Sequence, residues 1–175
     1  MEREMTLVFD IEANGLYEDV DQIHCIAIHD TDTTTTETYN DQSLTNTITE
    51  GLTRLATADY IIGHNIITYD IPVIRKLYPF WDPDCTVLDT LLLSRLYHTN
   101  IFDIDKKHKW NHMPLQLYGR HSLESYGYRL KEYKGDFHRD ADWSHWSPEM
   151  EDYCKQDTIV NAKLWQHFQK YLTGS

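Results

Sequence analysis

Hydrophobic and polar positions alternate along residues 6–12 in the way that a β-strand requires. The run Thr6-Leu7-Val8-Phe9-Asp10-Ile11-Glu12 is dominated by apolar, β-branched and aromatic residues, and Ala13-Asn14-Gly15 follows as a breaker. Because side chains alternate between faces along a strand, Asp10 and Glu12 share one face, opposite to Leu7, Phe9 and Ile11. Two like charges at the end of a buried strand require a cation between them or a proton on one of them. The alternative is that these acids simply end a strand near water.

Four further runs along the chain are typical of strands. The runs at 22–29 and 33–39 follow the first strand after short connections, which predicts an antiparallel meander of three strands. The run at 33–39 is rich in threonine and suits the edge of a sheet. Short apolar runs at 60–62 and 85–88 predict two more strands.

Helical spacing and capping residues predict five helices. The first is expected behind Ser43 as N-cap, on the spacing of Leu44, Ile48, Leu52 and Leu55. The others are expected from Asp70-Ile71-Pro72, over 91–96, over 122–130, and from Ser147-Pro148-Glu149 onward. We expect a long irregular stretch up to about Arg120 and a polar loop from Gly135 to His145.

This order of elements predicts one α/β domain over residues 1–175, with three antiparallel strands followed by helices that alternate with parallel strands. Hydrophobic residues make up 41% of the chain, which indicates a globular protein. No apolar run approaches the roughly 18–20 residues that cross a bilayer, and the charged start argues against a secretory signal. The three cysteines form no CxxC pair, which favours reduced thiols in a cytoplasm over a zinc site or disulfide framework.

The formal net charge of −12 is unevenly distributed. The segment Ile101–Trp146 holds 8 basic and 7 acidic residues, whereas the rest of the chain holds 8 basic and 21 acidic residues. Phosphate contacts need Lys and Arg, so this chain is not expected to wrap a duplex. It suits a protein that holds a few nucleotides at an acidic, metal-filled cleft.

Two further acids stand where partners are needed. Asp157 falls on the apolar face of the last predicted helix, four residues after Tyr153, and a buried carboxylate there requires either an arginine or a metal ion. Asp70 opens a helix directly after a strand and loop, at the end of an α/β sheet where ligands bind. The alternative for Asp70 is a helix-capping role.

Three motifs in this order resemble the DEDD 3′→5′ exonucleases. They are Asp10-Ile11-Glu12, then Asn65 three residues before Tyr69-Asp70, then Tyr153 three residues before Asp157. The tyrosine in the third motif resembles the DEDDy branch. The resemblance is closer to the proofreading domain of family A DNA polymerases from T-odd-type podophages and covers about residues 6–170. It rests also on Leu88-Asp89-Thr90-Leu91, Leu93-Ser94-Arg95-Leu96, His121-Ser122-Leu123-Glu124, Gly127-Tyr128-Arg129-Leu130 and Asp152-Tyr153-Cys154-Lys155-Gln156-Asp157.

The resemblance implies an RNase H-like fold with a mixed five-stranded sheet flanked by helices. It implies release of nucleoside 5′-monophosphates from the 3′ end of DNA, in a proofreading role, with two Mg²⁺ or Mn²⁺ ions per active site. Asp10 would bridge both ions, Glu12 and Asp157 would hold the water-activating ion, and Asp70 would serve the second ion through water. Tyr153, with an intrinsic pKa of about 10, would orient the attacking water rather than act as a base.

The implied partners are the 3′ end of single-stranded DNA and a DNA polymerase domain or subunit. No membrane is implied, and a phage protein would work in the host cytoplasm. The polymerase itself is absent from this sequence, so an excised domain and a separately encoded subunit both stay open.

The resemblance also suggests substrate contacts for Leu16, as an apolar wedge beside the terminal base, and for Asn65. The basic cluster of Lys106, Lys107 and Lys109 with Trp110 suits backbone and stacking contacts to a single strand, although such runs are often merely solvated. His108 and His112 have the spacing of a metal pair but no third ligand nearby. Asp89 is expected either to support the metal ligands or to cap the end of a strand.

Two other functions stay open on the sequence. The same fold serves 3′→5′ exoribonucleases, and a non-catalytic module associated with a polymerase belongs to a different class. All four acids and the tyrosine are present, which argues for the enzyme.

Overall fold

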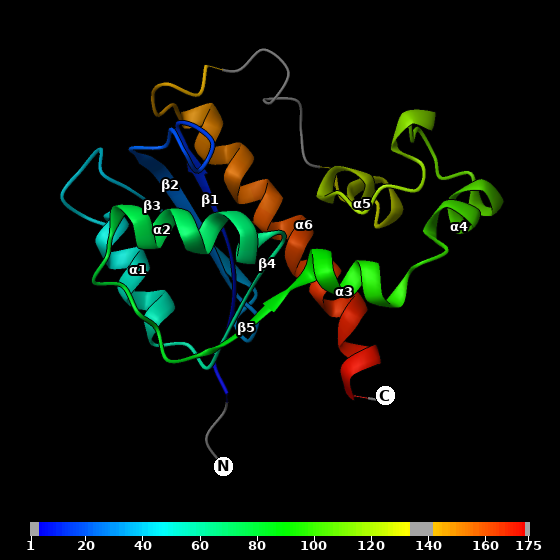
Figure 1. Cartoon of the computed structure of the whole chain (residues 1–175), viewed down its shortest axis with the longest axis horizontal. Helices are drawn as coiled ribbons and strands as arrows, with labels where there is room; N and C mark the ends of the chain where they lie inside the picture. The colour runs from blue at the N-terminus through cyan, green and yellow to red at the C-terminus, as the bar shows by residue number, and fades with distance from the viewer. Residues whose placement is uncertain (1–3, 134–141, 174–175) are drawn as a thin grey trace.

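The five runs expected as strands pair into one sheet in the order β3-β2-β1-β4-β5 (Figure 1). The computed structural model describes residues 4–133 and 142–173. The strands are β1 (Thr6–Ala13), β2 (Ile23–Asp30), β3 (Thr35–Asn40), β4 (Tyr60–Gly63) and β5 (Thr86–Asp89). The first three form the expected antiparallel meander, and β4 and β5 add in parallel. The predicted α/β fold with a mixed sheet is therefore confirmed.

The central strand β1 extends beyond its parallel neighbour. β4 pairs with β1 only from Thr6 to Val8, whereas β2 pairs with β1 from Leu7 to Ala13. The second half of β1 therefore has an open backbone edge on the β4 side. β4 ends at Gly63, and the close packing there favours glycine, because a Cβ atom at this position would lie 2.3 Å from Cγ2 of Ile66.

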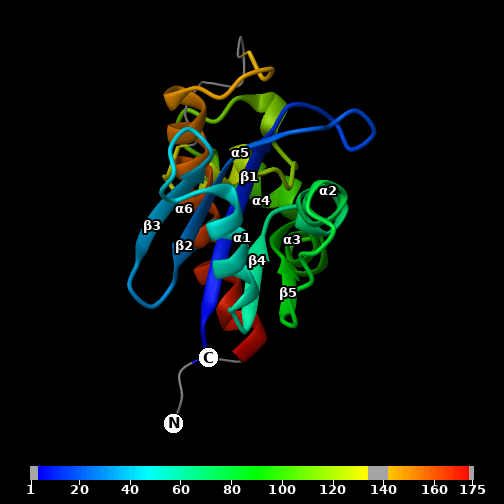
Figure 2. The same ribbon diagram turned by 90° about the vertical axis from the view of Figure 1, so that its left-hand side faces the viewer.

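Helices cover both faces of the sheet. The helices α1 (Ile48–Ala56) and α2 (Ile71–Leu77) lie on one face, and the long α6 (Pro148–Thr173) lies on the other (Figure 2). Val8 packs in one apolar cluster with Ala162 and Trp165 of α6. Because Asp10 and Glu12 follow Val8 at steps of two residues, they also face α6.

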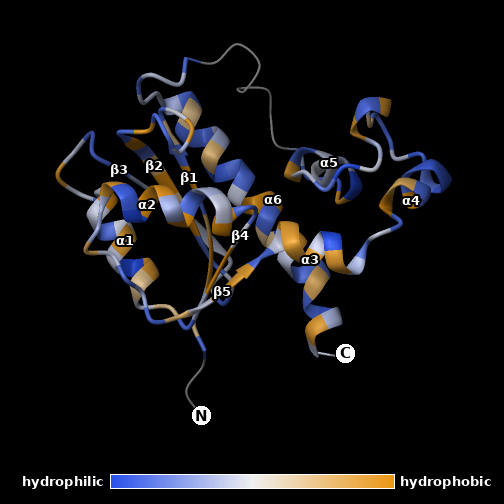
Figure 3. Ribbon diagram, viewed as in Figure 1, coloured by the Kyte–Doolittle hydropathy of each residue, from blue (hydrophilic) through white to orange (hydrophobic). Residues whose placement is uncertain are grey.

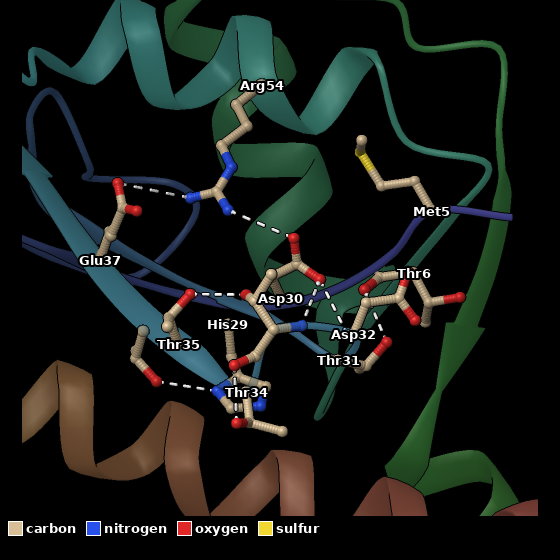
Figure 4. A network of polar contacts seen from close by, with 12 residues as sticks. Met5, Thr6, His29, Asp30, Thr31, Asp32, Thr34, Thr35, Glu37 and Arg54 are labelled. Carbon is tan, nitrogen blue, oxygen red and sulfur yellow. Dashed lines mark hydrogen bonds and ion pairs between the residues drawn. The ribbon is translucent and has the colours of Figure 1, made fainter. Parts of the chain in front are cut away.

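Arg54 connects α1 to the β2–β3 edge. Its guanidinium lies 3.9 Å from the Asp30 carboxylate and 3.8 Å from Glu37 (Figure 4). It also donates a hydrogen bond of 3.0 Å to the hydroxyl of Tyr39. Such partly exposed pairs are worth about 0–1 kcal/mol each. They orient α1, while the packing of its buried face supplies most of the stability.

A second apolar cluster joins α6 to the helices that precede it. These are α3 (Thr90–Tyr97), α4 (Ile101–His108) and α5 (Leu123–Arg129), with a 3₁₀ turn at Leu115–Leu117. The buried residues of this second cluster are Ile101, Leu123, Tyr126, Val160, Leu164 and Phe168. The predicted apolar face of α6 is thus confirmed, and Ser147 caps this helix by accepting from the N–H of Met150 at 3.1 Å.

Two expectations about helices are wrong. Helix α1 begins at Ile48 with Thr47 as N-cap, not behind Ser43, and Leu44 is 95% exposed. The hydroxyl of Thr47 accepts from the N–H of Glu50, and this bond sets the helix start. The stretch expected to be irregular contains α4, five of whose eight residues are polar, as Figure 3 shows by colour.

The polar loop expected from Gly135 to His145 lies partly outside the described residues. Within residues 4–133 and 142–173, no helix has the length and apolarity that a membrane span requires.

Candidate active site

Asp10 and Glu12 stand on the open-edged half of β1. Their cross-strand partners on β2 are Ala27 and Cys25, which belong to the small apolar cluster under the first turns of α6. Glu12 is 9% exposed. The alternative that these acids simply end a strand near water therefore does not hold for Glu12.

Asp70 reaches β1 from the other side of the open edge. The chain leaves β4 through a π-helical turn, Ile66–Asp70, and Asp70 precedes α2 without capping it. Its carboxylate instead accepts a hydrogen bond of 3.2 Å from the backbone N–H of Ile11, the residue between Asp10 and Glu12. The capping alternative for Asp70 is wrong, because its side chain satisfies the edge of β1 rather than the start of α2.

Helix α6 contributes Asp157, Cys154 and Tyr153. Asp157 is buried and lines the same cleft as Asp10. The thiol of Cys154 lies 3.5 Å from the carbonyl oxygen of Asp10 and 3.8 Å from its Oδ2. Tyr153 is half-buried, and its ring meets the ring of Trp143 edge to face at 6.4 Å.

The carboxylates raise one another's pKa values. Burial, and then the charges of Asp10 and Asp157, raise the pKa of Glu12 well above its usual range. Burial and the charge of Asp10 raise the pKa of Asp70 in the same way, against the lowering by the Ile11 N–H. Burial raises the pKa of the neighbouring Tyr69 to about 12, with these carboxylates adding to the effect. The site therefore disfavours its own full ionisation and gains from a bound cation.

The donor set suits a hard divalent ion. One ligand atom each of Asp10, Glu12 and Cys154 lies within 4.8 Å of the others. Carboxylate oxygens are the ligands that Mg²⁺ and Mn²⁺ prefer. The pKa of Cys154 is raised well above its usual range, by burial first, so its sulfur stays a protonated thiol beside the carboxylates. Among the described residues, no other group of three such side chains has ligand spacing.

Asp89 holds the loop between β4 and the π-helical turn. Its Oδ1 accepts from the N–H groups of Asn65 and Leu91, both at 2.9 Å, and its Oδ2 accepts from Ile67 at 3.1 Å. Of the two roles expected for Asp89, the structure thus supports the cap. Because Asn65 adopts a left-handed conformation with φ 64°, these bonds also fix its strained backbone.

A cleft of about 470 Å³ opens beside the carboxylates. Asp10 and Asp157 lie along it together with His64 and Asn65 from the end of β4. Its other sides come from α3 and from the segment that leads into α5, and they include Leu91, Arg95, Gly119, Arg120, His121 and Ser122. Asn65, expected as a substrate contact, thus lies where a strand end could approach the acids.

Leu16 lies beside a second hollow, of about 330 Å³, together with Glu12, Tyr69 and Trp143. It is 71% exposed. Two bonds hold its loop in place: the hydroxyl of Tyr69 donates to the carbonyl of Gly15 at 2.6 Å, and Lys76 donates to the carbonyl of Tyr17 at 2.6 Å. An exposed leucine on a fixed loop suits the wedge expected from the sequence, which stays a prediction.

The predicted basic cluster lies on and after α4, and none of its residues lines the cleft. Lys106 is exposed and lies 3.9 Å from Asp103, and Lys107 is also exposed. The indole of Trp110 stacks on His108 with ring centroids 4.6 Å apart and donates to the buried Asp105 at 2.8 Å. Their role as substrate contacts stays a prediction, while Trp110 already has a structural partner.

Sequence reasoning missed the arginines of the cleft and the closeness of Cys154 to Asp10. Arg95 and His121 stand in two of the family-like motifs, which was a usable signal. Arg120 carried no such signal, because its place depends on the fold of the segment between α4 and α5.

Known proteins share the family and part of the sequence of this chain. A family model described as the RNase_H superfamily matches residues 7–169. The DNA-directed DNA polymerase of Escherichia phage T7 is 33% identical over 180 residues, which cover 90% of this chain and 26% of the polymerase. The polymerase of Enterobacteria phage T3 is 32% identical with the same coverage. The chain thus spans about a quarter of the length of these curated relatives.

Solved structures share the fold. Brucella melitensis NrnC matches with a TM-score of 0.66 at 16% identity, covering 98% of this chain and 76% of NrnC. The E. coli ExoI–ssDNA complex matches with a TM-score of 0.58 at 18% identity, covering 99% of this chain and 42% of ExoI. At these identities the likeness describes the architecture alone.

Proposed function

We propose that this chain, which belongs to the RNase H superfamily, is a metal-dependent 3′→5′ exonuclease of the DEDDy type that hydrolyses DNA. The observation that carries the proposal is the bond between the Asp70 carboxylate and the Ile11 N–H. It brings an acid from beyond β4 to the strand that carries Asp10 and Glu12, opposite Asp157 on α6. Four carboxylates that lie close enough to raise one another's pKa values, two of them lining the cleft, suit phosphodiester hydrolysis better than a binding module.

Asp10, Glu12, Asp70 and Asp157 would hold two Mg²⁺ or Mn²⁺ ions. Bound there, such ions supply the acidification of the attacking water and the stabilisation of the departing 3′ oxygen. The chain's own part is to fix these carboxylates on rigid elements, since β1, α2 and α6 are all tied into the core. Tyr153, on the first turns of α6, would orient the water through its hydroxyl, because a phenol with a pKa of about 10 is a poor base near neutrality.

We propose that the terminal nucleotide lies between the cleft and the Leu16 loop. Leu16 would contact the terminal base and Asn65 would contact the strand at the end of β4. Lys106, Lys107 and Trp110 would meet the strand only farther from the acids, since they do not line the cleft.

We further propose that the physiological partner is a DNA polymerase domain or subunit and that the reaction is proofreading, in the cytoplasm of a phage-infected host. Support comes from the 33% identity to the T7 polymerase over 90% of this chain.

The proposal is tested with matched substrates: linear and circular single-stranded DNA, and a linear RNA of the same sequence. An exonuclease degrades the linear strand and leaves the circle intact. Faster hydrolysis of RNA than of DNA would move the assignment to an exoribonuclease. Nicking of the circle would contradict the exonuclease assignment.

A further inference from the structure

We infer that Arg95 and Arg120 form the phosphate-binding side of the cleft and hold the strand whose 3′ end meets the carboxylates. This inference rests on the proposed function, because it deepens the same site. Both arginines line the cleft that Asp10 and Asp157 also line. Together they add two cationic side chains to a cleft that two carboxylates also line.

Arg95 is placed by α3. This helix begins at the Asp89 cap, and Leu91 and Arg95 are four residues apart, so their side chains lie one turn apart on the same face. Arg95 is exposed, and among residues 4–133 and 142–173 it forms no ion pair. Its guanidinium is therefore available to a ligand in the cleft.

Arg120 is placed by a buried salt bridge. Asp105, which has no exposed surface, accepts from the N–H of Gly119 at 2.8 Å and pairs with Arg129 at 2.7 Å. Arg129 in turn donates to the carbonyl of Arg120 at 2.7 Å. These bonds fix the backbone on both sides of Arg120 and connect it to α4 and α5.

The side chain of Arg120 is held as well. Its Nε donates to the carbonyl of Gln116 at 2.8 Å, which leaves the terminal nitrogens of the guanidinium for an anion. Within the described part of the chain, Arg120 has no carboxylate partner. An arginine held by its Nε presents a planar pair of donors, which matches the oxygens of a phosphate.

Charge explains why two arginines matter in this protein. With a net charge of −12, the surface as a whole repels a polyanion, and the carboxylates of Asp10 and Asp157 in the cleft repel it further. A strand can enter only where local cations compensate. Each phosphate contact to a single strand contributes about 0.7 to the slope of log K against log salt. Arg95 and Arg120 should therefore dominate the salt dependence of binding.

The test uses the full chain and a 5′-labelled single-stranded oligonucleotide. KM and kcat are measured at several NaCl concentrations, and Kd is measured by fluorescence anisotropy in EDTA. The variants are Arg95→Ala, Arg120→Ala, their double variant, and the double variant Arg95→Lys with Arg120→Lys. Arg75→Ala is the matched control, because Arg75 is an exposed arginine on α2 that does not line the cleft.

Each alanine variant should raise KM and Kd about fivefold near 0.1 M salt, and the double variant should flatten the salt slope by about 1.4. The kcat should stay within about twofold, because the inference assigns both arginines to binding of the strand and not to the chemical step. The lysine double variant should keep the slope, and Arg75→Ala should match the wild type.

Three outcomes would overturn the inference. The alanine double variant could match Arg75→Ala in KM and slope, or it could lose kcat at unchanged KM. In both cases an active wild type would leave the proposed function standing. If the wild type neither shortens nor binds the oligonucleotide, the proposed function fails, and this inference fails with it.

Discussion

The carboxylate of Asp70 accepts a hydrogen bond of 3.2 Å from the backbone N–H of Ile11. This N–H lies on the half of β1 that extends past β4, where no neighbouring strand pairs with it on that side. An acid that satisfies the open edge is thereby held against two other acids, Asp10 and Glu12. The bond that satisfies the open edge of β1 thus also positions Asp70 in the site. It holds the Asp70 carboxylate close to Asp10, where the two charges repel each other.

This repulsion predicts a pH-dependent gain in stability for Asp70→Asn. Burial and Asp10 raise the pKa of Asp70 in the folded protein, so between the unfolded and folded pKa values the folded state binds more protons. This contribution to the free energy of unfolding therefore falls as pH rises from about 4. In EDTA, the Tm of Asp70→Asn minus that of the wild type should increase with pH, reaching a few degrees near pH 8.

The comparison with the wild type is needed because histidines act in the opposite sense. Burial lowers the pKa of His167 to about 4, so protonation of the unfolded state makes stability rise with pH up to about 6.5. His167 is present in both proteins, and the difference in Tm cancels its effect. A Tm difference that does not change between pH 5 and pH 8 would contradict the repulsion at Asp70.

Tyr153→Phe should slow hydrolysis while leaving metal binding intact. The substitution removes only the hydroxyl proposed to orient the water, and the carboxylates that would bind the ions stay in place. We expect kcat to fall by about 10- to 100-fold, at or below the lower end of general-acid/base effects, because Tyr153 would only orient the water. The measurement is kcat at saturating Mg²⁺, together with the Mg²⁺ concentration for half-maximal rate. Unchanged turnover would remove the role of Tyr153.

Asp89→Ala should destabilise the protein by about 3 kcal/mol, because three backbone N–H groups lose an ionised acceptor. Asp89→Asn should cost less, since a single amide oxygen can replace Oδ1 and keep the bonds to Asn65 and Leu91. Urea unfolding at pH 7 gives both values. If the two variants are equally stable, the cap does not hold the loop as described.

Asp105→Ala should cost about 3–5 kcal/mol, because it leaves the charge of the buried Arg129 without its partner. Replacing both residues by apolar ones, as Asp105→Leu with Arg129→Met, should recover most of this loss. Urea unfolding of the single and double variants tests the coupling. A double variant as unstable as Asp105→Ala would mean that packing, not charge, makes the site sensitive.

Much of the fold could be predicted because its elements have clear periodicity. β1 to β3 alternate or are β-rich with short connections, and α6 has a cap, a first-turn proline and an apolar stripe. Helix α4 escaped prediction because its buried face includes Asp105, a charged residue that later residues of the chain satisfy, namely Arg129 with Trp110 and Gly119. Leu44 misled the prediction of α1, since a leucine at helical spacing can still be exposed.

The candidate site, like the fold, could be predicted from the sequence only in part. The four acids could be predicted because residue type, strand parity and position at element ends all indicated them. Of the two arginines of the cleft, Arg95 stood in a family-like motif, but its place beside the acids, like that of Arg120, depends on how α3 and the segment before α5 pack. The bond from Ile11 to Asp70 was also hidden. The short run at 60–62 indicates that β4 ends before β1 does, but no pattern in the sequence shows which side chain meets the open edge of β1.

Digestion of a 5′-labelled single-stranded oligonucleotide with the wild type and with Asp10→Asn tests whether the carboxylate site supports metal-dependent 3′→5′ hydrolysis. The reactions contain Mg²⁺, Mn²⁺ or EDTA, and circular dichroism confirms that the variant is folded. A metal-dependent 3′→5′ exonuclease assignment predicts a ladder that shortens from the 3′ end with the wild type in Mg²⁺ or Mn²⁺, and none in EDTA or with Asp10→Asn. A ladder that persists in EDTA or with folded Asp10→Asn, or no shortening by the wild type with either ion, would contradict it.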